Sequence, residues 1–161
     1  MLAYVFWHRP TGEAATYEDA LRAFHAALAA DPPPGFHRSL AVRLDAAPWL
    51  AGTGTAYEDW YLVADWAALG TLNEAAVSGA RRSPHDAVAG RAGHGAGAVY
   101  APLAGAGDGL AGDRAAWLAK PAGTSYGDWL ATLTAMGTEV WQRQMTLGPA
   151  PEFVVFGDAP G

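Results

Sequence analysis

The stretch VFWHRPTG, residues 5–12, followed by TYEDALRAF, residues 16–24, occurs in a second, similar form later in the chain. That second form reads AWLAKPAG over residues 116–123 and SYGDWLATL over residues 125–133. Each copy is an apolar run, a basic residue, proline and glycine, followed by a hydroxyl residue, tyrosine, aspartate and leucine. This pattern predicts a strand, a turn and a capped helix, used twice. The repeat therefore predicts two related halves in one chain.

The composition limits what the chain can do. Its 161 residues carry a formal net charge of −6, with a single lysine, Lys120, and scattered arginines. Because no basic stripe is present to neutralise phosphates, we expect no nucleic-acid partner and no anionic membrane surface. The lack of cysteine excludes disulfides, thiolate catalysis and cysteine-ligated metals. Residues 1–10 do not resemble a signal peptide and no apolar run reaches membrane-spanning length, so we expect a cytoplasmic protein.

Strand and helix signals alternate along the chain. Apolar or alternating runs predict strands, and apolar residues three and four apart predict helices. We expect strands at 2–8, 36–44, 57–64 and 96–103, with helices that begin at 16, 66 and 83. After a glycine-rich joint at 104–113 we expect a strand at 115–120, a helix at 125–136, and strands at 139–146 and 152–156.

This order predicts an α+β fold. Apart from the short helix at 83, the first elements follow the βαββαβ order of a ferredoxin-like unit. We therefore predict a ferredoxin-like unit over residues 1–103, the joint over 104–113, and a truncated βαββ repeat over 114–161 that packs on the first unit. The sheets should be antiparallel, with the helices on one face. In the second strand Leu40, Val42 and Leu44 alternate with polar residues, and we place this apolar side against the helices.

Two short motifs match known sites but fit simpler explanations. GDGLAG, residues 107–112, matches the dinucleotide-binding pattern, yet the stretch after it is a short strand broken by Pro121. We interpret it as the joint between the two halves. GTSYG, residues 123–127, matches the nucleophile elbow of hydrolases, yet no histidine follows His94. Because Ser125 aligns with Thr16 of the first copy, we interpret both as helix N-caps.

The main functional prediction is a polar and aromatic face of the sheet, opposite the helices. We place on it the side chains of His37, Arg43, Asp59, Tyr61, Tyr4, Phe6 and Tyr100. A face that mixes polar groups with aromatic rings is either solvated, or it lines a cavity or an interface, and this many rings favour the covered alternatives. None of the five histidines has the close spacing of a metal-ligand pair, so we predict no metal site.

Two histidines on strands are candidate acid/base groups. His8 ends the first strand and His37 lies on the polar side of the second, and histidine suits proton transfer at neutral pH. In this interpretation Arg43 holds an anionic group of the ligand, while Asp59 and Tyr61 orient it.

The chain resembles the dimeric α/β-barrel superfamily. The likeness rests on the element order over residues 2–103 and on WYLVADW, residues 60–66, followed by Leu69, Leu72 and Asn73. In that superfamily, ferredoxin-like units pair sheet against sheet around a barrel. Its members include antibiotic-biosynthesis monooxygenases, stress-responsive A/B-barrel proteins, muconolactone isomerases and haem-using chlorite dismutases with two fused units. The resemblance implies a homodimer and chemistry on a small apolar or aromatic ligand, without a cofactor.

Three functions remain open at this point. The first is a small-molecule-binding protein with a cavity on the sheet face and chemistry like that of a cofactor-free monooxygenase or isomerase. The second is a non-catalytic dimerisation or binding module whose sheet face is the dimer interface. The third, implied by the fused two-unit members, is a haem-binding protein with His94 or His85 as the axial ligand.

Overall fold

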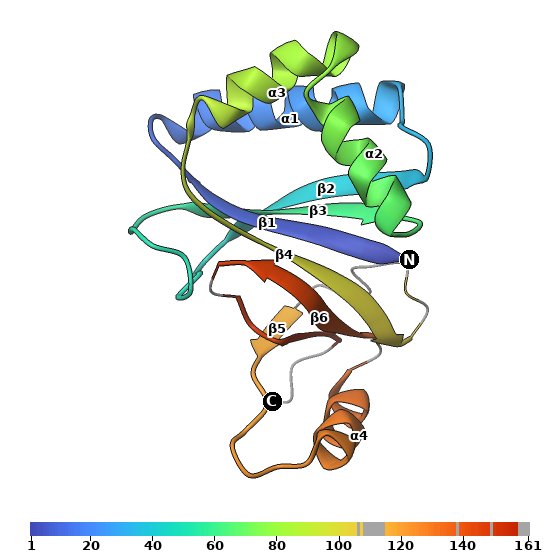
Figure 1. Ribbon diagram of the computed structural model, residues 1–161. Coiled ribbons are helices and arrows are strands. Elements are labelled where there is room, and N and C mark those ends of the chain that lie inside the picture. Colours follow the sequence, from blue (N-terminus) through green and yellow to red (C-terminus); the bar gives the residue numbers. More distant parts are fainter. Residues whose placement is uncertain (106, 108–114, 138, 149, 158–161) are drawn as a thin grey trace.

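The computed structural model describes residues 1–105, 107, 115–137, 139–148 and 150–157. The chain is an α+β protein, and these residues form one curled, seven-stranded antiparallel sheet with four α-helices and a short 3₁₀ helix (Figure 1). The strands are β1 (Leu2–Pro10), β2 (Phe36–Leu44), β3 (Ala56–Val63), β4 (Ala92–Ala104), β5 (Ala115–Leu118), β6 (Glu139–Leu147) and β7 (Phe153–Phe156). The helices are α1 (Ala14–Ala30), α2 (Trp66–Ala76), η1 (Gly79–Arg81), α3 (Arg82–Ala89) and α4 (Tyr126–Met136).

The strand order across the sheet is β2-β3-β1-β4-β6-β7-β5. β1 lies between β3 and β4, and the pairing of β4 with β6 joins the two halves of the chain into one sheet. Every expected strand and helix is present. The predicted joint at 104–113 and the GDGLAG motif lie almost entirely outside the described residues. Of the helices in the described part of the chain, none is both long and apolar enough to cross a membrane.

Local sequence explains where the helices begin. The Asp65 side chain accepts a hydrogen bond from the Ala68 N–H, and Ser125 accepts one from the Asp128 N–H, so both residues are N-caps. The capping role predicted for Ser125 is confirmed. The same role predicted for Thr16 is wrong, because α1 begins earlier, after Glu13. Alanine is the best helix former, and the two alanines after Glu13 extend the helix toward the N-terminus.

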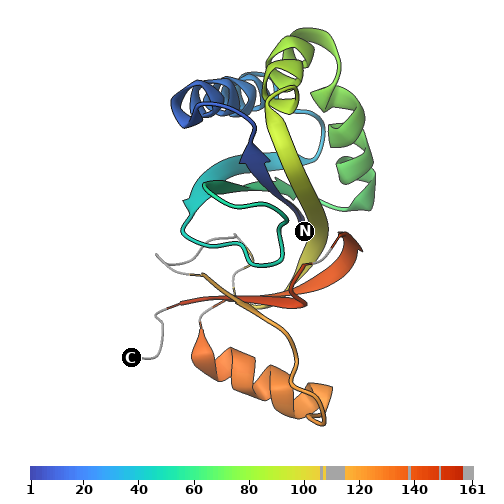
Figure 2. The ribbon, with the colours of Figure 1, turned by 90° about the vertical axis from the view of Figure 1, so that its left-hand side faces the viewer.

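The four helices cover one face of the curled sheet. α1, α2 and α3 pack on the strands of the first half through a core that includes Leu21, Phe24 and Leu72. α4 packs through Leu133 against Val140 of β6 and against β7. Figure 2 shows this helix, in orange, on the side of the molecule opposite to the blue and green helices. Because the sheet curls between them, both helix groups lie outside the curl.

The inner face of the curl is a tryptophan-rich core. The ring of Trp60 on β3 lies 5.9 Å from Trp117 on β5, 5.9 Å from Trp141 on β6 and 5.4 Å from Phe156 on β7. β1 and β4 separate β3 from these strands in the sheet, so only a strong curl brings the rings together. The second half of the chain thus covers the helix-free face of the first half, the face expected to pair with a second copy.

This inner core holds a buried carboxylate. Glu58 on β3 accepts hydrogen bonds from the indole N–H of Trp7 at 2.7 Å and of Trp60 at 2.6 Å, each on a different oxygen. Buried charged groups persist where their hydrogen-bonding capacity is met. Glu58 therefore fits a structural role inside the curl.

The predicted facing of β1, β2 and β3 is reversed in the structure, whereas Tyr100 of β4 lies on the helix-free face as predicted. Leu40 and Leu44 pack against the inner core, whereas Ser39 faces α1 and contacts His25. Side chains alternate along a strand, so a shift of one residue in the assignment exchanges the two faces. The prediction failed because the first half has no helix-free face exposed to solvent. The bulky rings of Trp7 and Trp60 take the inner side instead.

Candidate functional site

The cavity lies on the helix side of the sheet. Its volume is about 750 Å³, and its lining comes from β1, β3, β4, β6 and all three helices of the first half. Paired positions on β1 and β3 supply its floor, since Tyr4 pairs with Tyr61 and Phe6 pairs with Asp59. The lining residues that matter below are Tyr4, Phe6, His8, Tyr17, Asp59, Tyr61, Trp66, Ala76, His85 and Met145.

Glycines on β4 make room for the aromatic rings of this floor. A Cβ atom on Gly97 would lie 2.8 Å from the Tyr4 hydroxyl, and one on Gly95 would lie 2.7 Å from the Phe6 ring. Both distances are too short for a real Cβ contact, so a side chain at either position would force the ring to move. The GHGAG stretch, residues 93–97, thereby shapes the cavity.

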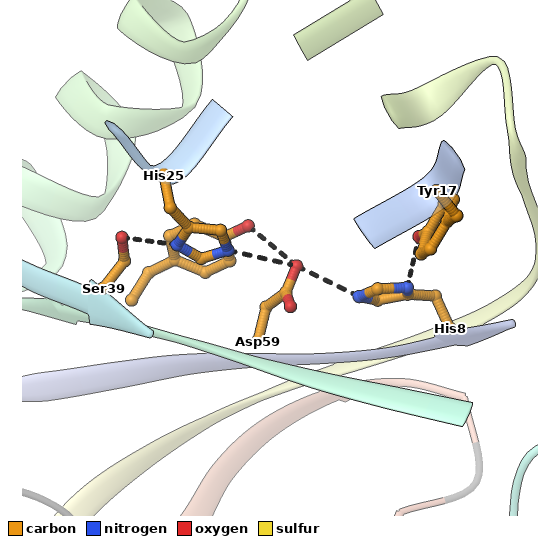
Figure 3. A network of polar contacts seen from close by, with 6 residues as sticks. His8, Tyr17, His25, Ser39 and Asp59 are labelled. Carbon is orange, nitrogen blue, oxygen red and sulfur yellow. Dashed lines mark hydrogen bonds and ion pairs between the residues drawn. The ribbon is translucent and has the colours of Figure 1, made fainter. Parts of the chain in front are cut away.

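A buried polar network surrounds Asp59 (Figure 3). Its Oδ2 atom lies 3.0 Å from His8 Nε2 and 3.7 Å from His25 Nε2, and it accepts a hydrogen bond of 3.1 Å from the Tyr61 hydroxyl. Neither histidine N–H is aligned for a linear hydrogen bond, so these two contacts are mainly electrostatic. The other oxygen, Oδ1, is buried and accepts no hydrogen bond from any described residue.

The network extends outward from Asp59 through both histidines. His8 Nδ1 is hydrogen-bonded to the Tyr17 hydroxyl, and His25 Nδ1 lies 2.7 Å from Ser39 Oγ. A carboxylate only accepts hydrogen bonds, so the tautomer with the proton on Nε2 is the one in which each ring stabilises the ionised Asp59. In the neutral rings Nδ1 then accepts from the Tyr17 and Ser39 hydroxyls. The result is a chain of hydroxyl, imidazole, carboxylate, imidazole and hydroxyl.

The protonation states follow from burial and charge. Burial by itself would raise the pKa of Asp59, but contact with the His25 and His8 rings outweighs it and lowers this pKa below its ordinary value. Burial, with the nearby charge of Asp59, raises the pKa of Tyr17 and of Tyr61. At neutral pH the site therefore holds an ionised carboxylate among neutral tyrosines, which donate hydrogen bonds.

Five of the predicted site residues line this cavity. They are His8, Asp59, Tyr61, Tyr4 and Phe6, although they lie on the helix side of the sheet and not on the predicted side. Their convergence depends on β1 and β3 being neighbours, which the repeat did not specify.

Three predicted residues lie elsewhere. His37 is exposed at a bulge of the edge strand β2, and Arg43 is exposed on the same strand. Tyr100 faces the inner core, where its hydroxyl donates to the Pro151 carbonyl at 2.6 Å. His37 therefore does not join His8 at this cavity, and Arg43 does not line it. The acid/base role of these histidines stays a prediction.

Sequence reasoning missed His25, Tyr17 and Ser39. Tyr17, Leu21, Phe24 and Leu28 are spaced three or four apart and form the buried stripe of α1. A buried tyrosine hydroxyl needs a polar partner. This need for a polar partner was the signal available in the sequence, because it calls for a polar side chain on the strand beneath the helix. His25 adjoins the same stripe. Its partner Asp59 is distant in sequence, so the contact was visible only in the fold.

Neither a metal nor haem is favoured by the arrangement of these side chains. In the described ranges no group of three or more histidine, aspartate or glutamate side chains is placed to hold a metal ion. Figure 3 shows the His8 and His25 rings on opposite sides of Asp59, whereas metal ligands converge on one point. Of the two histidines predicted as haem ligands, His85 lines the cavity, while His94 is exposed on β4 and does not.

No protein-family model, no curated protein and no solved structure matches this chain.

Proposed function

We propose that this chain binds a small apolar or aromatic molecule in the cavity between the sheet and α1–α3. The His8–Asp59 pair would transfer a proton to or from the bound molecule, as in a cofactor-free monooxygenase or isomerase. The observation that carries the proposal is Asp59, which is only 3% exposed, lines the cavity and has an oxygen without a hydrogen-bond partner among the described residues. Buried polar groups without partners are rare in folded proteins and concentrate where ligands bind or chemistry occurs.

The apolar rim of the cavity supports binding of an apolar body. Trp66 is 48% exposed, Val77 is 47% exposed and Met145 is 49% exposed, and all three line the cavity. They line the same cavity as Tyr4, Phe6 and Tyr61 of its aromatic floor. Ligand sites combine such apolar walls with a few convergent polar groups, and here the polar groups belong to the Asp59 network.

The architecture agrees with a ferredoxin-like unit, which we propose for the first half. The elements β1, α1, β2, β3, α2 and β4 follow the βαββαβ order, and their strands lie in the order β2-β3-β1-β4. The second half, β5, α4, β6 and β7, has the strand order β6-β7-β5, which parallels β2-β3-β1. This parallel supports a truncated repeat of the first unit.

A binding test can use a cavity-blocking variant and a matched control on the same helix. Ala76 lines the cavity from α2, and Ala67 is exposed on α2 outside the lining. We expect the neutral probe N-phenyl-1-naphthylamine to show a saturable fluorescence increase with the wild type and with Ala67→Phe. Ala76→Phe should abolish this increase while its circular dichroism spectrum and melting temperature stay close to those of the control. Equal binding by both variants, or no saturable binding by the wild type, contradicts the proposal.

The proton-transfer part needs the natural ligand. Native mass spectrometry of protein purified from its own host should detect a retained small molecule in the wild type and not in Ala76→Phe. Turnover of that molecule should fall by at least about a hundredfold in His8→Asn, because general acid–base catalysis typically contributes that much, while its binding persists. Unchanged turnover in His8→Asn would leave the cavity as a binding site without this chemistry.

A further inference from the structure

The charged groups around the cavity determine which polar end group a bound ligand can carry. None of its lining residues within the described ranges is a lysine or an arginine. The ionisable side chains that line it are Asp59, His8, His85 and the tyrosines. Arg43, which was predicted to hold an anion, is exposed on the edge strand and does not line the cavity. An anionic ligand would therefore meet the ionised Asp59 without a fixed positive charge to offset it.

Two of the tyrosine hydroxyl protons near Asp59 are already engaged. The Tyr61 hydroxyl donates to Asp59, and the Tyr17 hydroxyl is bonded to His8. The free capacity of this network is that of an acceptor, since Asp59 Oδ1 has no partner among the described residues and a carboxylate can accept several hydrogen bonds. A ligand that donates a hydrogen bond would complete the network, and a ligand that can only accept would not.

The cavity walls favour a cation over a neutral group. Tyr4 is stacked with Phe6 at a ring distance of 6.3 Å and with Tyr61 at 6.0 Å, and Trp66 lies at the exposed rim. Aromatic faces carry partial negative charge and attract ammonium groups, most strongly where water is excluded. The carboxylate and these rings together form the kind of surrounding that binds organic amines.

We infer that the cavity selects ligands whose apolar body carries a hydrogen-bond-donating end, with a protonated amine preferred, and that it excludes carboxylates and other anions. The inference rests on the proposed function, because it specifies the ligand class of the same cavity. It follows from the position of Asp59, from the lack of lining cations in the described residues and from the aromatic walls. Like charges in a desolvated site repel strongly, so the selectivity should be large.

Three probes that share one ring test the inference. They are 2-naphthylmethylammonium, 2-naphthylmethanol and 2-naphthoate, titrated into the full chain at pH 7 by isothermal calorimetry. We expect the ammonium probe to bind most tightly, the alcohol next, and the carboxylate at least about tenfold more weakly than the alcohol. Asp59→Asn should remove the advantage of the ammonium probe and reduce the discrimination against the carboxylate.

The neighbouring carboxylate supplies the control. Glu58→Gln makes the same chemical change on the opposite face of β3, away from the cavity, and should leave the ranking of the three probes unchanged. Circular dichroism confirms that both variants fold. If all probes bind and the carboxylate equals or exceeds the others, the inference is overturned and the cavity function stands. The inference is also overturned if Asp59→Asn preserves the ranking. If no probe binds, the proposed function is overturned as well.

Discussion

Glu58 and Asp59 are adjacent on β3, and they represent two different uses of a buried carboxylate. Glu58 points into the curl, where each of its oxygens accepts an indole N–H. Asp59 points to the helices, where one oxygen contacts two histidines and a tyrosine while the other has no partner among the described residues. Both side chains are almost fully buried, so burial does not separate them. What separates them is whether each of the two oxygens has a hydrogen-bond donor among the described residues.

The pKa values of the two carboxylates also shift in opposite directions. Burial raises the pKa of Glu58, and the hydrogen bonds from Trp60, Trp7 and Trp117 only partly oppose it. Burial acts on Asp59 in the same sense, but His25 and His8 reverse the outcome and lower its pKa. Neutral indole donors stabilise a carboxylate less than histidines, which can become positively charged. Glu58 is therefore suited to holding the inner core together, and Asp59 to acting on a ligand.

The largest expected effect comes from removing the centre of the inner core. Trp60 has no exposed surface and contacts rings from three strands of the second half. Trp60→Ala should lower the free energy of unfolding by about 3–5 kcal/mol, as is typical when a buried tryptophan is truncated. Urea unfolding, followed by far-ultraviolet circular dichroism, measures this loss. The control Trp66→Ala, at the exposed rim, should change stability by less than about 0.5 kcal/mol but weaken binding of N-phenyl-1-naphthylamine. Similar losses in both variants would contradict the contrast between core and cavity.

Matched amide substitutions compare the two carboxylates directly. Glu58→Gln places an N–H group against an indole N–H, which should lower the free energy of unfolding by about 1–3 kcal/mol at pH 7. Asp59→Asn should lower it by less than about 1 kcal/mol, because the amide oxygen keeps its donors and the NH₂ group takes the side where Oδ1 has no partner among the described residues. Ligand binding should be weakened more by Asp59→Asn than by Glu58→Gln. If Asp59→Asn is the more destabilising change, Asp59 has mainly a structural role.

The smallest effects appear in the pH dependence of the same variants. A raised pKa means that the folded state binds the Glu58 proton more tightly, so the wild type gains stability over Glu58→Gln as pH falls from neutral toward 4.5, the ordinary value for this group. A lowered pKa has the opposite consequence, because the folded state then loses stability when the group is protonated. The stability advantage of the wild type over Asp59→Asn should be complete above pH 3.8, the ordinary pKa of this group, and should shrink as pH falls below that value. Urea midpoints measured in steps from pH 7 to about pH 3 test both signs. If the urea midpoints of the two variants differed from the wild type in the same way at every pH, the opposite pKa shifts of Glu58 and Asp59 would be contradicted.

Much of the site was predicted from sequence, yet on the opposite face of the sheet. The strands were found because apolar and alternating runs are local signals, and the N-cap Ser125 was found for the same reason. Five of the eight predicted site residues line the cavity. The facing of the strands was mistaken because β1 and β3 are apolar on both sides. Such strands do not reveal which face meets the helices.

The sequence by itself determined the element order, the exclusion of cysteine chemistry and the residue types available for acid–base work. These properties depend on composition and on periodicities that span only a few residues. The tertiary structure alone decided that His25 and Tyr17 join His8 at Asp59, that Arg43 does not, and that the second half fills the inner face. Those outcomes depend on which strands pair and how strongly the sheet curls. Contacts between residues distant in the chain determine both, and they leave no local pattern to detect.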